Sequence, residues 1–201
     1  MLDAQKIYDE QYAKRYQVLA STNLGKAIYH TRWALIERYC PPNGQTVLDY
    51  GCGPASFHAH GPDGYQKLNY DINPTCGFTE KVWQVGPTSP ESCDPRVKVD
   101  VLTMWDSIEH VPSFYTEIRD INAEWLFIST PNLDSVKGPF EFWKHRRPKE
   151  HIFHFTKDGL EVILEDLGYQ VIECNYDEGK LRDPHNPSAI LTLVAKRRAS
   201  N

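Results

Sequence analysis

The sequence lacks the marks of a secreted, disulfide-bonded or membrane-spanning protein. Its five cysteines are odd in number and scattered, and no two of them form a C-x-x-C pair. This use of cysteine fits a reduced intracellular protein better than a disulfide scaffold or a cysteine zinc site. No apolar run approaches the roughly 18 residues of a membrane span. The first residues, Met1 to Lys6, contain no apolar segment of a signal peptide. We therefore expect a cytoplasmic protein with no membrane span.

Two widespread catalytic motifs are also missing. The sequence contains no G-x-x-x-x-G-K-[ST] phosphate loop and no G-x-S-x-G nucleophile elbow. Its net charge of −5 gives no general attraction to nucleic acid or to an anionic membrane. These absences argue against a P-loop nucleotide hydrolase, a serine hydrolase and a general nucleic-acid binder.

The composition that is present is that of an ordinary globular protein. Hydrophobic residues make up 40% and charged residues 24% of the 201 residues. The chain is long enough to bury a core, and no repeat, low-complexity segment or linker divides it. We therefore expect a single domain over residues 1–201.

The strongest local signal is a glycine turn that follows an apolar, β-branched run. Residues 46–50 (TVLDY) lead into residues 51–55 (GCGPA). A buried parallel strand delivers its carboxyl end to a ligand in this way, and glycine is needed because a Cβ would collide with that ligand. Asp71 ends a second apolar run, 22 residues after Asp49. A carboxylate at this spacing suits the two hydroxyls of a ribose.

Apolar periodicity predicts alternating helices and strands. Helices are expected over residues 4–20, from an N-cap at Asn23 to Tyr39, from Pro112, and from an N-cap at Thr156 to Gly168. Strands are expected at residues 46–50, 68–71, 82–85, 97–104, 125–130, 171–175 and 189–194, with the last two joined by a polar connection suited to a hairpin. This order predicts one doubly wound α/β sheet, mostly parallel, with N-terminal helices and a terminal antiparallel strand pair.

Three segments together resemble a known family. The turn that starts at Asp49, the acid Asp71 and the later segment 106–111 (DSIEHV) are similar to class I S-adenosylmethionine-dependent methyltransferases, in the branch of the ubiquinone-biosynthesis O-methyltransferases. The chain departs from the family at Ala55, where a third glycine is usual. The resemblance implies a Rossmann-like methyltransferase fold, with an α/β core over residues 45–197 and residues 1–40 as a helical lid.

The resemblance also implies that S-adenosyl-L-methionine binds beyond the carboxyl ends of the strands. The turn amides would face its amino-acid part, Asp71 its ribose and Ile72 its adenine. The expected cofactor residues are Asp49, Gly51, Cys52, Gly53, Asp71, Ile72, Trp105 and Asp106. Asp49 can equally brace the glycine turn, and Trp105 can equally be a core residue.

Glu109 and His110 are the expected catalytic residues. Methyl transfer from a sulfonium needs an acceptor that lies in line with the methyl group and can lose a proton. An adjacent acid and imidazole near a predicted helix start can serve that purpose. The alternative is that Glu109 only stabilises a helix dipole and that His110 only satisfies a loop carbonyl.

Asp106, Glu109, His110 and His151 resemble a metal-ligand set. The pattern is similar to the E-x-x-E-H set of ubiquinone O-methyltransferases and of small-RNA 2′-O-methyltransferases, and the latter add a later histidine that His151 matches. On a helix the first three residues would share a face. Carboxylate and imidazole ligands suit Mg²⁺, Mn²⁺ or Zn²⁺. Two points weigh against a metal: the first acid here is one methylene shorter, and related enzymes carry Asp/Glu-His at this turn without an ion.

Residues 140–155 interleave aromatic and basic side chains. Such a segment can stack on a ring and hold a phosphate or carboxylate, or it can be a solvated charge run. In related methyltransferases this region borders the acceptor pocket. We therefore expect methyl transfer to an oxygen or nitrogen of a small molecule, with an anionic acceptor if this segment binds it.

Three alternatives stay open. One is a methyltransferase acting on a nucleic-acid end or modified nucleotide, although the chain lacks the Asn/Asp-Pro-Pro-aromatic tetrad and the Pro-Cys nucleophile of DNA base methyltransferases. Another is a catalytically silent member that binds the cofactor or a partner. A nicotinamide dehydrogenase is the third, because the acid after the second strand would suit it too.

Overall fold

The computed structural model of the protein describes residues 10–71 and 99–199. Its helices are α2 (Glu10–Ser21), α3 (Asn23–Tyr39), α4 (Ser56–Ala59), α5 (Phe114–Ile121), α6 (Lys157–Asp166) and α7 (Asp177–Arg182). Its strands are β1 (Thr46–Tyr50), β2 (Gln66–Tyr70), β3 (Val101–Trp105), β4 (Trp125–Pro131), β5 (Tyr169–Asn175) and β6 (Ile190–Arg197). Short 3-10 turns are η1 (Ile108–His110), η2 (Leu133–Ser135), η3 (Phe140–Phe142) and η4 (Pro187–Ala189).

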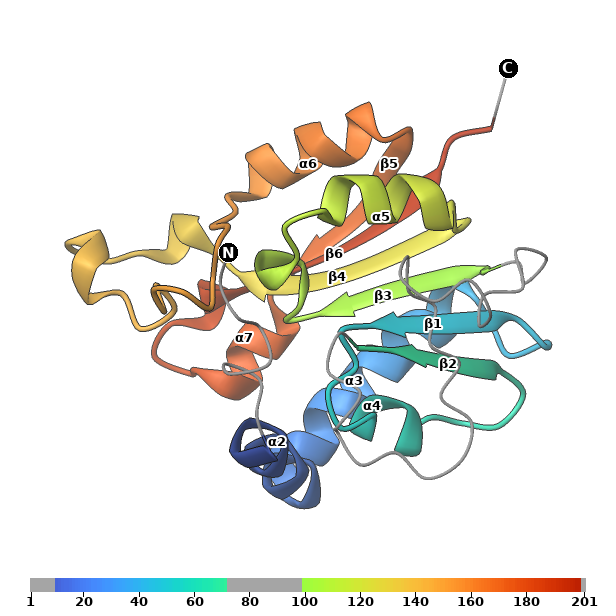
Figure 1. The fold of residues 1–201 in the computed structure, drawn as a ribbon, viewed down its shortest axis with the longest axis horizontal. Coiled ribbons are helices and arrows are strands. Elements are labelled where there is room, and N and C mark those ends of the chain that lie inside the picture. Colours follow the sequence, from blue (N-terminus) through green and yellow to red (C-terminus); the bar gives the residue numbers. More distant parts are fainter. Residues whose placement is uncertain (1–9, 72–98, 200–201) are drawn as a thin grey trace. The chain divides into compact units, whose positions relative to one another are not determined.

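The strands form a sheet in the order β2-β1-β3-β4-β6-β5 (Figure 1). β1 pairs in parallel with both β2 and β3, so that Leu48 lies opposite Leu68 and Leu102. β6 runs antiparallel to both β4 and β5. Helices precede β1 and lie between β1 and β2, β3 and β4, β4 and β5, and β5 and β6. This is the mixed α/β architecture expected of a Rossmann-like methyltransferase fold. The predicted fold class is confirmed.

The chain divides between Thr103 and Met104 into two compact units. In the first unit all residues of β1 are buried, as expected for a parallel strand covered on both faces. Trp33 of α3 stacks on Phe57 of α4 with ring centroids 4.6 Å apart. Its indole N–H also donates to the Phe57 carbonyl at 2.9 Å. These two contacts fix α4, which directly follows the glycine turn, against α3.

In the second unit α6 has the boundaries that its sequence predicts. The hydroxyl of Thr156 accepts a hydrogen bond from the backbone N–H of Gly159, which caps the helix start. Leu160 and Leu164 are fully buried, one turn apart on the same face. Gly168 follows the helix at φ 83°, a left-handed conformation that ends helices.

β5 and β6 form the predicted antiparallel pair, with a bulge between Val171 and Glu173 of β5. The connection between them is not the predicted plain hairpin, because it contains α7 and η4. α7 ends in Arg182.

One further local prediction is wrong: the N-cap of α3 is Thr22 and not Asn23. The Thr22 hydroxyl accepts from the Gly25 backbone N–H at 3.0 Å. The predicted strand 82–85 and the part of the first helix before Glu10 lie outside the described residues. None of the helices in residues 10–71 and 99–199 has both the length and the apolarity needed to cross a membrane.

Candidate functional site

The glycine turn after β1 has the left-handed backbone that its glycines predict. Gly51 has φ 80° and Gly53 has φ 50°, values that cost a non-glycine residue about 1–2 kcal/mol. Ala55 adopts φ 51° without being glycine. A Cβ built on Gly53 meets no atom of the described chain within 4 Å. The backbone of Gly53 is therefore open to a ligand on that side.

The turn is held by hydrogen bonds to the end of β2. The backbone N–H groups of Gly51 and Cys52 donate to the Tyr70 carbonyl at 2.8 and 3.0 Å. The N–H of Gly53 donates to Oδ2 of Asp71 at 2.8 Å. The structure thus brings together four of the predicted cofactor residues, and Asp71 braces the turn with its carboxylate.

Asp49 lies on β1 directly before the turn and is 3% exposed. Burial raises the pKa of its carboxyl to about 7, and the charge of Asp71 raises it further. The Thr103 hydroxyl donates to Oδ1 of Asp49 at 2.8 Å, and this bond and the charge of Arg32 act in the opposite direction. Asp49 is therefore a buried acid that titrates near neutral pH, beside the turn that it was predicted to brace.

In the second unit Glu109 is a buried acid on η1, 1% exposed. Its Oε2 accepts a hydrogen bond from the Thr130 hydroxyl at 3.0 Å. Burial, followed by the charge of Asp106, raises the pKa of Glu109 well above its ordinary value. Its carbonyl accepts from the backbone N–H groups of Ile152 and Phe153 at 3.0 and 3.2 Å. Glu109 therefore fastens the segment around residue 152 to η1.

That fastening brings His151 next to His110. The two rings meet edge to face, with centroids 4.6 Å apart. Nδ1 of His110 lies 2.8 Å from the Glu150 carbonyl, an acceptor, so Nδ1 carries the proton. Nε2 of the same ring lies 3.9 Å from Oε1 of Glu109. Burial lowers the pKa of both imidazoles, that of His151 to about 3, and the rings are neutral at physiological pH.

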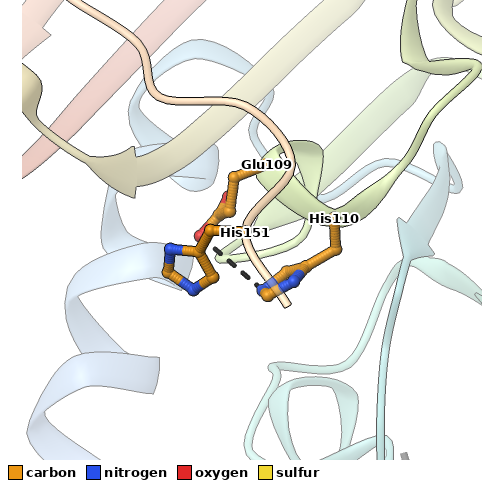
Figure 2. A group of neighbouring side chains, drawn as sticks. All are labelled: Glu109, His110 and His151. Atoms are coloured by element: carbon orange, nitrogen blue, oxygen red, sulfur yellow. Dashed lines mark ion pairs between the residues drawn. The ribbon is translucent and has the colours of Figure 1, made fainter. Parts of the chain in front are cut away.

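Glu109, His110 and His151 converge (Figure 2). One ligand atom of each lies within 4.8 Å of the others. Within the described chain, Nδ1 of His151 is buried and has no hydrogen-bond partner. A carboxylate, two neutral imidazoles and an orphaned buried nitrogen fit a divalent metal. The same groups also fit proton transfer.

Asp106, the fourth predicted ligand, does not belong to this group of three. Its two oxygens accept from Nη1 of Arg182 at 2.8 and 2.9 Å. Trp105, beside it, is a buried residue whose ring centroid lies 6.4 Å from that of Phe127. The predicted adenine contact, Ile72, lies outside the described residues.

The predicted acceptor segment, residues 140–155, is held at its C-terminal end and partly exposed. The backbone N–H of Leu133 donates to the carbonyl of Phe155, the last residue of the segment, at 2.8 Å. Phe142 is 86% exposed. The guanidinium of Arg146 lies 5.8 Å from the ring centroid of Phe140. This contact joins a basic and an aromatic side chain, the combination that the alternation of such residues in the segment predicts.

Sequence reasoning missed Thr103 and Arg182. Thr103 carries a hydroxyl in β3, a strand whose residues are all buried. A buried hydroxyl needs a hydrogen-bond partner, so its presence in an apolar strand could have indicated a polar contact. Arg182 pairs with Asp106, 76 positions away in the sequence. No local sequence pattern predicts a contact between residues so far apart.

The sequence matches the family model of a methyltransferase domain over residues 9–174. No curated protein matches the sequence. Solved structures share the fold. Magnesium protoporphyrin IX methyltransferase (ChlM) from Synechocystis PCC 6803 with bound SAH is 14% identical at a TM-score of 0.63, with 97% of this chain and 98% of that chain covered. A SAM-dependent methyltransferase from Archaeoglobus fulgidus is 18% identical at 0.58, with 84% and 94% covered.

The small RNA methyltransferase HEN1 is 18% identical at a TM-score of 0.60 over 88% of this chain, which spans only 26% of the HEN1 chain. The likeness to the ubiquinone branch stays a prediction, since neither the family model nor these structures concern that branch. The family model, in contrast, covers well over half of the chain. The protein therefore belongs to the methyltransferase domain family.

Proposed function

We propose that the protein transfers a methyl group from S-adenosylmethionine to an oxygen or nitrogen of an anionic small molecule. The observation that carries this proposal is the convergence of Glu109, His110 and His151 within 4.8 Å. Hydroxyl and amine acceptors must lose a proton during methylation, and the neutral imidazole of His110, whose Nε2 carries no proton, can take it beside Glu109. Methylation at carbon needs no such group when the acceptor is already a carbanion.

The proposed cofactor site is the glycine turn with Asp71. The open backbone at Gly53 admits a ligand that lies directly against the chain, which a side chain there would exclude. Asp71 is half-buried and accepts from the turn through Oδ2. A carboxylate has further acceptor capacity for ribose hydroxyls. S-adenosylmethionine bound there supplies an electrophilic methyl group, and this chain's part is to orient it and exclude water.

A divalent metal is the second part of the proposal. Glu109, His110 and His151 would hold it, and a bound Mn²⁺, Zn²⁺ or Mg²⁺ lowers the pKa of an acceptor hydroxyl and positions it. Thr130 orients the Glu109 carboxylate through its hydroxyl. The Glu150 carbonyl holds His110 in the tautomer that carries its proton on Nδ1. These two contacts orient the ligating groups in the manner of supporting residues at metal sites.

The experiment combines binding and turnover. Calorimetry with S-adenosylhomocysteine tests the cofactor site, and transfer of labelled methyl from S-adenosylmethionine to a panel of carboxylated and phosphorylated hydroxyl or amine compounds tests the reaction. Excess chelator should abolish transfer, re-added Mn²⁺ or Mg²⁺ should restore it, and His151→Ala should remove it. Full activity in chelator would leave Glu109 and His110 as an acid-base pair without metal. Cofactor binding with no transfer to any acceptor would favour a catalytically silent protein.

One observation favours a second candidate, methylation of a nucleic-acid end or modified nucleotide. Phe142 is 86% exposed, and the basic residues Lys144 and Arg147, close to it in the sequence, are exposed as well. Single-stranded nucleic acids bind to aromatic side chains flanked by basic side chains. Binding of a labelled single-stranded RNA should then fall steeply with salt. RNA binding that does not distinguish the ends of the strand and that disappears at physiological salt would be non-specific charge attraction. That outcome would exclude this candidate.

A further inference from the structure

Asp106 has a partner that the sequence does not predict. Both oxygens of its carboxylate lie within 2.9 Å of Nη1 of Arg182, from the end of α7. Hydrogen bonds between a guanidinium and a carboxylate are among the strong ones, since both groups are charged. The pair is only partly exposed, at 27% for the Arg182 side chain and 20% for that of Asp106. Salt therefore screens the attraction within this ion pair less than it would in a fully exposed pair.

Arg182 is itself anchored by a second acid. Nη1 lies 3.4 Å from Oε2 of Glu178, one turn earlier on α7, and the Glu178 side chain is 1% exposed. A buried carboxylate needs compensating charge, so Arg182 is held between Glu178 and Asp106. Asp106 is fixed from its own side as well, because it has a left-handed backbone at φ 51° and its N–H donates to the Ser129 carbonyl at 2.8 Å.

Asp106 is nonetheless an electrostatic neighbour of two of the three converging residues. Its charge raises the pKa of Glu109 and also that of His110. A carboxylate in that neighbourhood would be attracted to a divalent ion held by Glu109, His110 and His151. Arg182 would compete with that ion for the two Asp106 oxygens.

We infer that Arg182 is a positioning residue that withholds Asp106 from the metal and limits the site to two imidazoles and one carboxylate. The inference rests on the metal part of the proposed function. It also bears on the identity of the ion. A ligand set of two imidazoles and one carboxylate suits Mn²⁺ or Zn²⁺, whereas Mg²⁺ prefers oxygen ligands. Release of Asp106 would add an oxygen ligand and shift the preference towards Mg²⁺.

The test is calorimetric titration of metal-stripped protein with Mn²⁺ and, separately, with Mg²⁺. Wild type should bind one Mn²⁺, and Asp106→Ala should bind it within about two-fold of wild type. Arg182→Ala should bind both ions more tightly, by about ten-fold or more, the scale on which residues around metal ligands act. The double variant Asp106→Ala/Arg182→Ala should lose that gain.

Lys180→Ala is the matched control, because it breaks an exposed ion pair with Asp177 on the same helix, at 2.8 Å, and should change neither titration. If Arg182→Ala unfolds because Glu178 loses its counter-charge, Arg182→Gln/Glu178→Gln replaces it, with circular dichroism as the check.

The metal titrations distinguish a failure of the inference about Arg182 from a failure of the proposed metal site. A ten-fold loss of Mn²⁺ affinity in Asp106→Ala would make Asp106 a ligand and overturn the inference. An unchanged or weakened affinity in a folded Arg182 variant would overturn it as well, while the metal site survives. Absence of Mn²⁺ binding in both wild type and the Arg182 variant would overturn the metal site and the inference together.

Discussion

The backbone N–H of Gly53 donates a 2.8 Å hydrogen bond to the carboxylate of Asp71. The bond joins the glycine turn after β1 to the residue that follows β2, so two features that the sequence presents 18 residues apart form one structure. A cofactor bound at this turn, as we propose, would meet an acid whose position is fixed before binding. Preorganisation of this kind reduces the entropy that a site loses when its ligand arrives.

Asp71→Ala should weaken the binding of S-adenosylhomocysteine by about ten- to a hundred-fold. The variant removes a charged hydrogen-bond acceptor, worth about 1.5–3 kcal/mol, and releases the Gly53 amide. Calorimetry on wild type and variant measures the change. Asp63→Ala, which removes an exposed acid in the same unit, should bind as wild type does. Equal affinities for Asp71→Ala and wild type would disprove the proposed ribose contact.

Ala55→Gly should stabilise the protein. Ala55 has φ 51°, which costs alanine about 1–2 kcal/mol, whereas glycine accepts it and loses only about 0.5–1 kcal/mol through the freedom of the unfolded chain. The net gain is about 0.5–1 kcal/mol, which raises Tm by roughly 1–4 °C in a chain of this size. Thermal unfolding followed by circular dichroism measures it. A lower Tm would show that the alanine methyl makes contacts that outweigh its strain.

His58 should make the protein less stable in acid. Burial, followed by the charge of Lys67, lowers the pKa of this imidazole from 6.5 to about 3, while Asn69 acts weakly in the opposite direction. The unfolded chain binds a proton near pH 6.5 and the folded chain does not, so stability is lost as pH falls from about 6.5 towards 3. Between pH 7 and pH 5 this amounts to about 2 kcal/mol.

His58→Leu removes this titration. The Asn69 side chain is close enough to act on the imidazole, but neither ring nitrogen of His58 makes a hydrogen bond of good geometry in the described chain. The apolar replacement therefore leaves no new unpaired group. Urea unfolding at pH 5 and pH 7 should show a smaller loss for the variant than for wild type. Parallel pH curves for the two proteins would contradict a neutral buried imidazole.

Gly179→Ala should destabilise the protein by about 1–3 kcal/mol or more, the range for overpacked interiors. A Cβ on this α7 glycine would lie 1.9 Å from the Pro187 carbonyl oxygen. Lys180→Ala on the same helix is the matched control, because it truncates an exposed side chain and alanine favours the helix. Chemical unfolding compares the two. Equal stability of Gly179→Ala and Lys180→Ala would contradict the close approach of Gly179 to the Pro187 backbone.

Arg146→Ala/Arg147→Ala should raise KM for an anionic acceptor and leave cofactor affinity unchanged. The two guanidiniums supply positive charge to the aromatic segment, and Arg146 stacks on Phe140. Arg119→Ala/Arg198→Ala, which removes two exposed arginines paired with Asp120 and Glu165, controls for net charge. Unchanged kinetics in the double variant would reduce the segment to a solvated surface.

The elements that the sequence predicts well are those whose signals are local. α6 has a capping threonine, buried leucines one turn apart and a terminating glycine, and each of these acts within a few residues. β1 is an unbroken buried run followed by glycines. The same locality limits the prediction at α3, where Thr22 and Asn23 are both good caps and only the geometry at Gly25 selects the first.

The elements that the sequence predicts poorly depend on contacts between distant residues. α7 carries little apolar periodicity, and its place is set by the close approach of Gly179 to the Pro187 backbone. His151 meets His110 because the Glu109 carbonyl accepts two backbone N–H groups from residues 152 and 153. Spacing along the chain reports neither contact, and only the resemblance to known methyltransferases indicated His151.

The bulge in β5 lies in the strand at one end of the sheet. β5 ends the strand order, and the extra residue between Val171 and Glu173 breaks its regular ladder. An edge strand with an even row of unpaired N–H and C=O groups is a template on which a second chain can add, and bulges remove that regularity. The bulge therefore disfavours edge-to-edge pairing of two copies at a strand that also carries Ile172, 43% exposed.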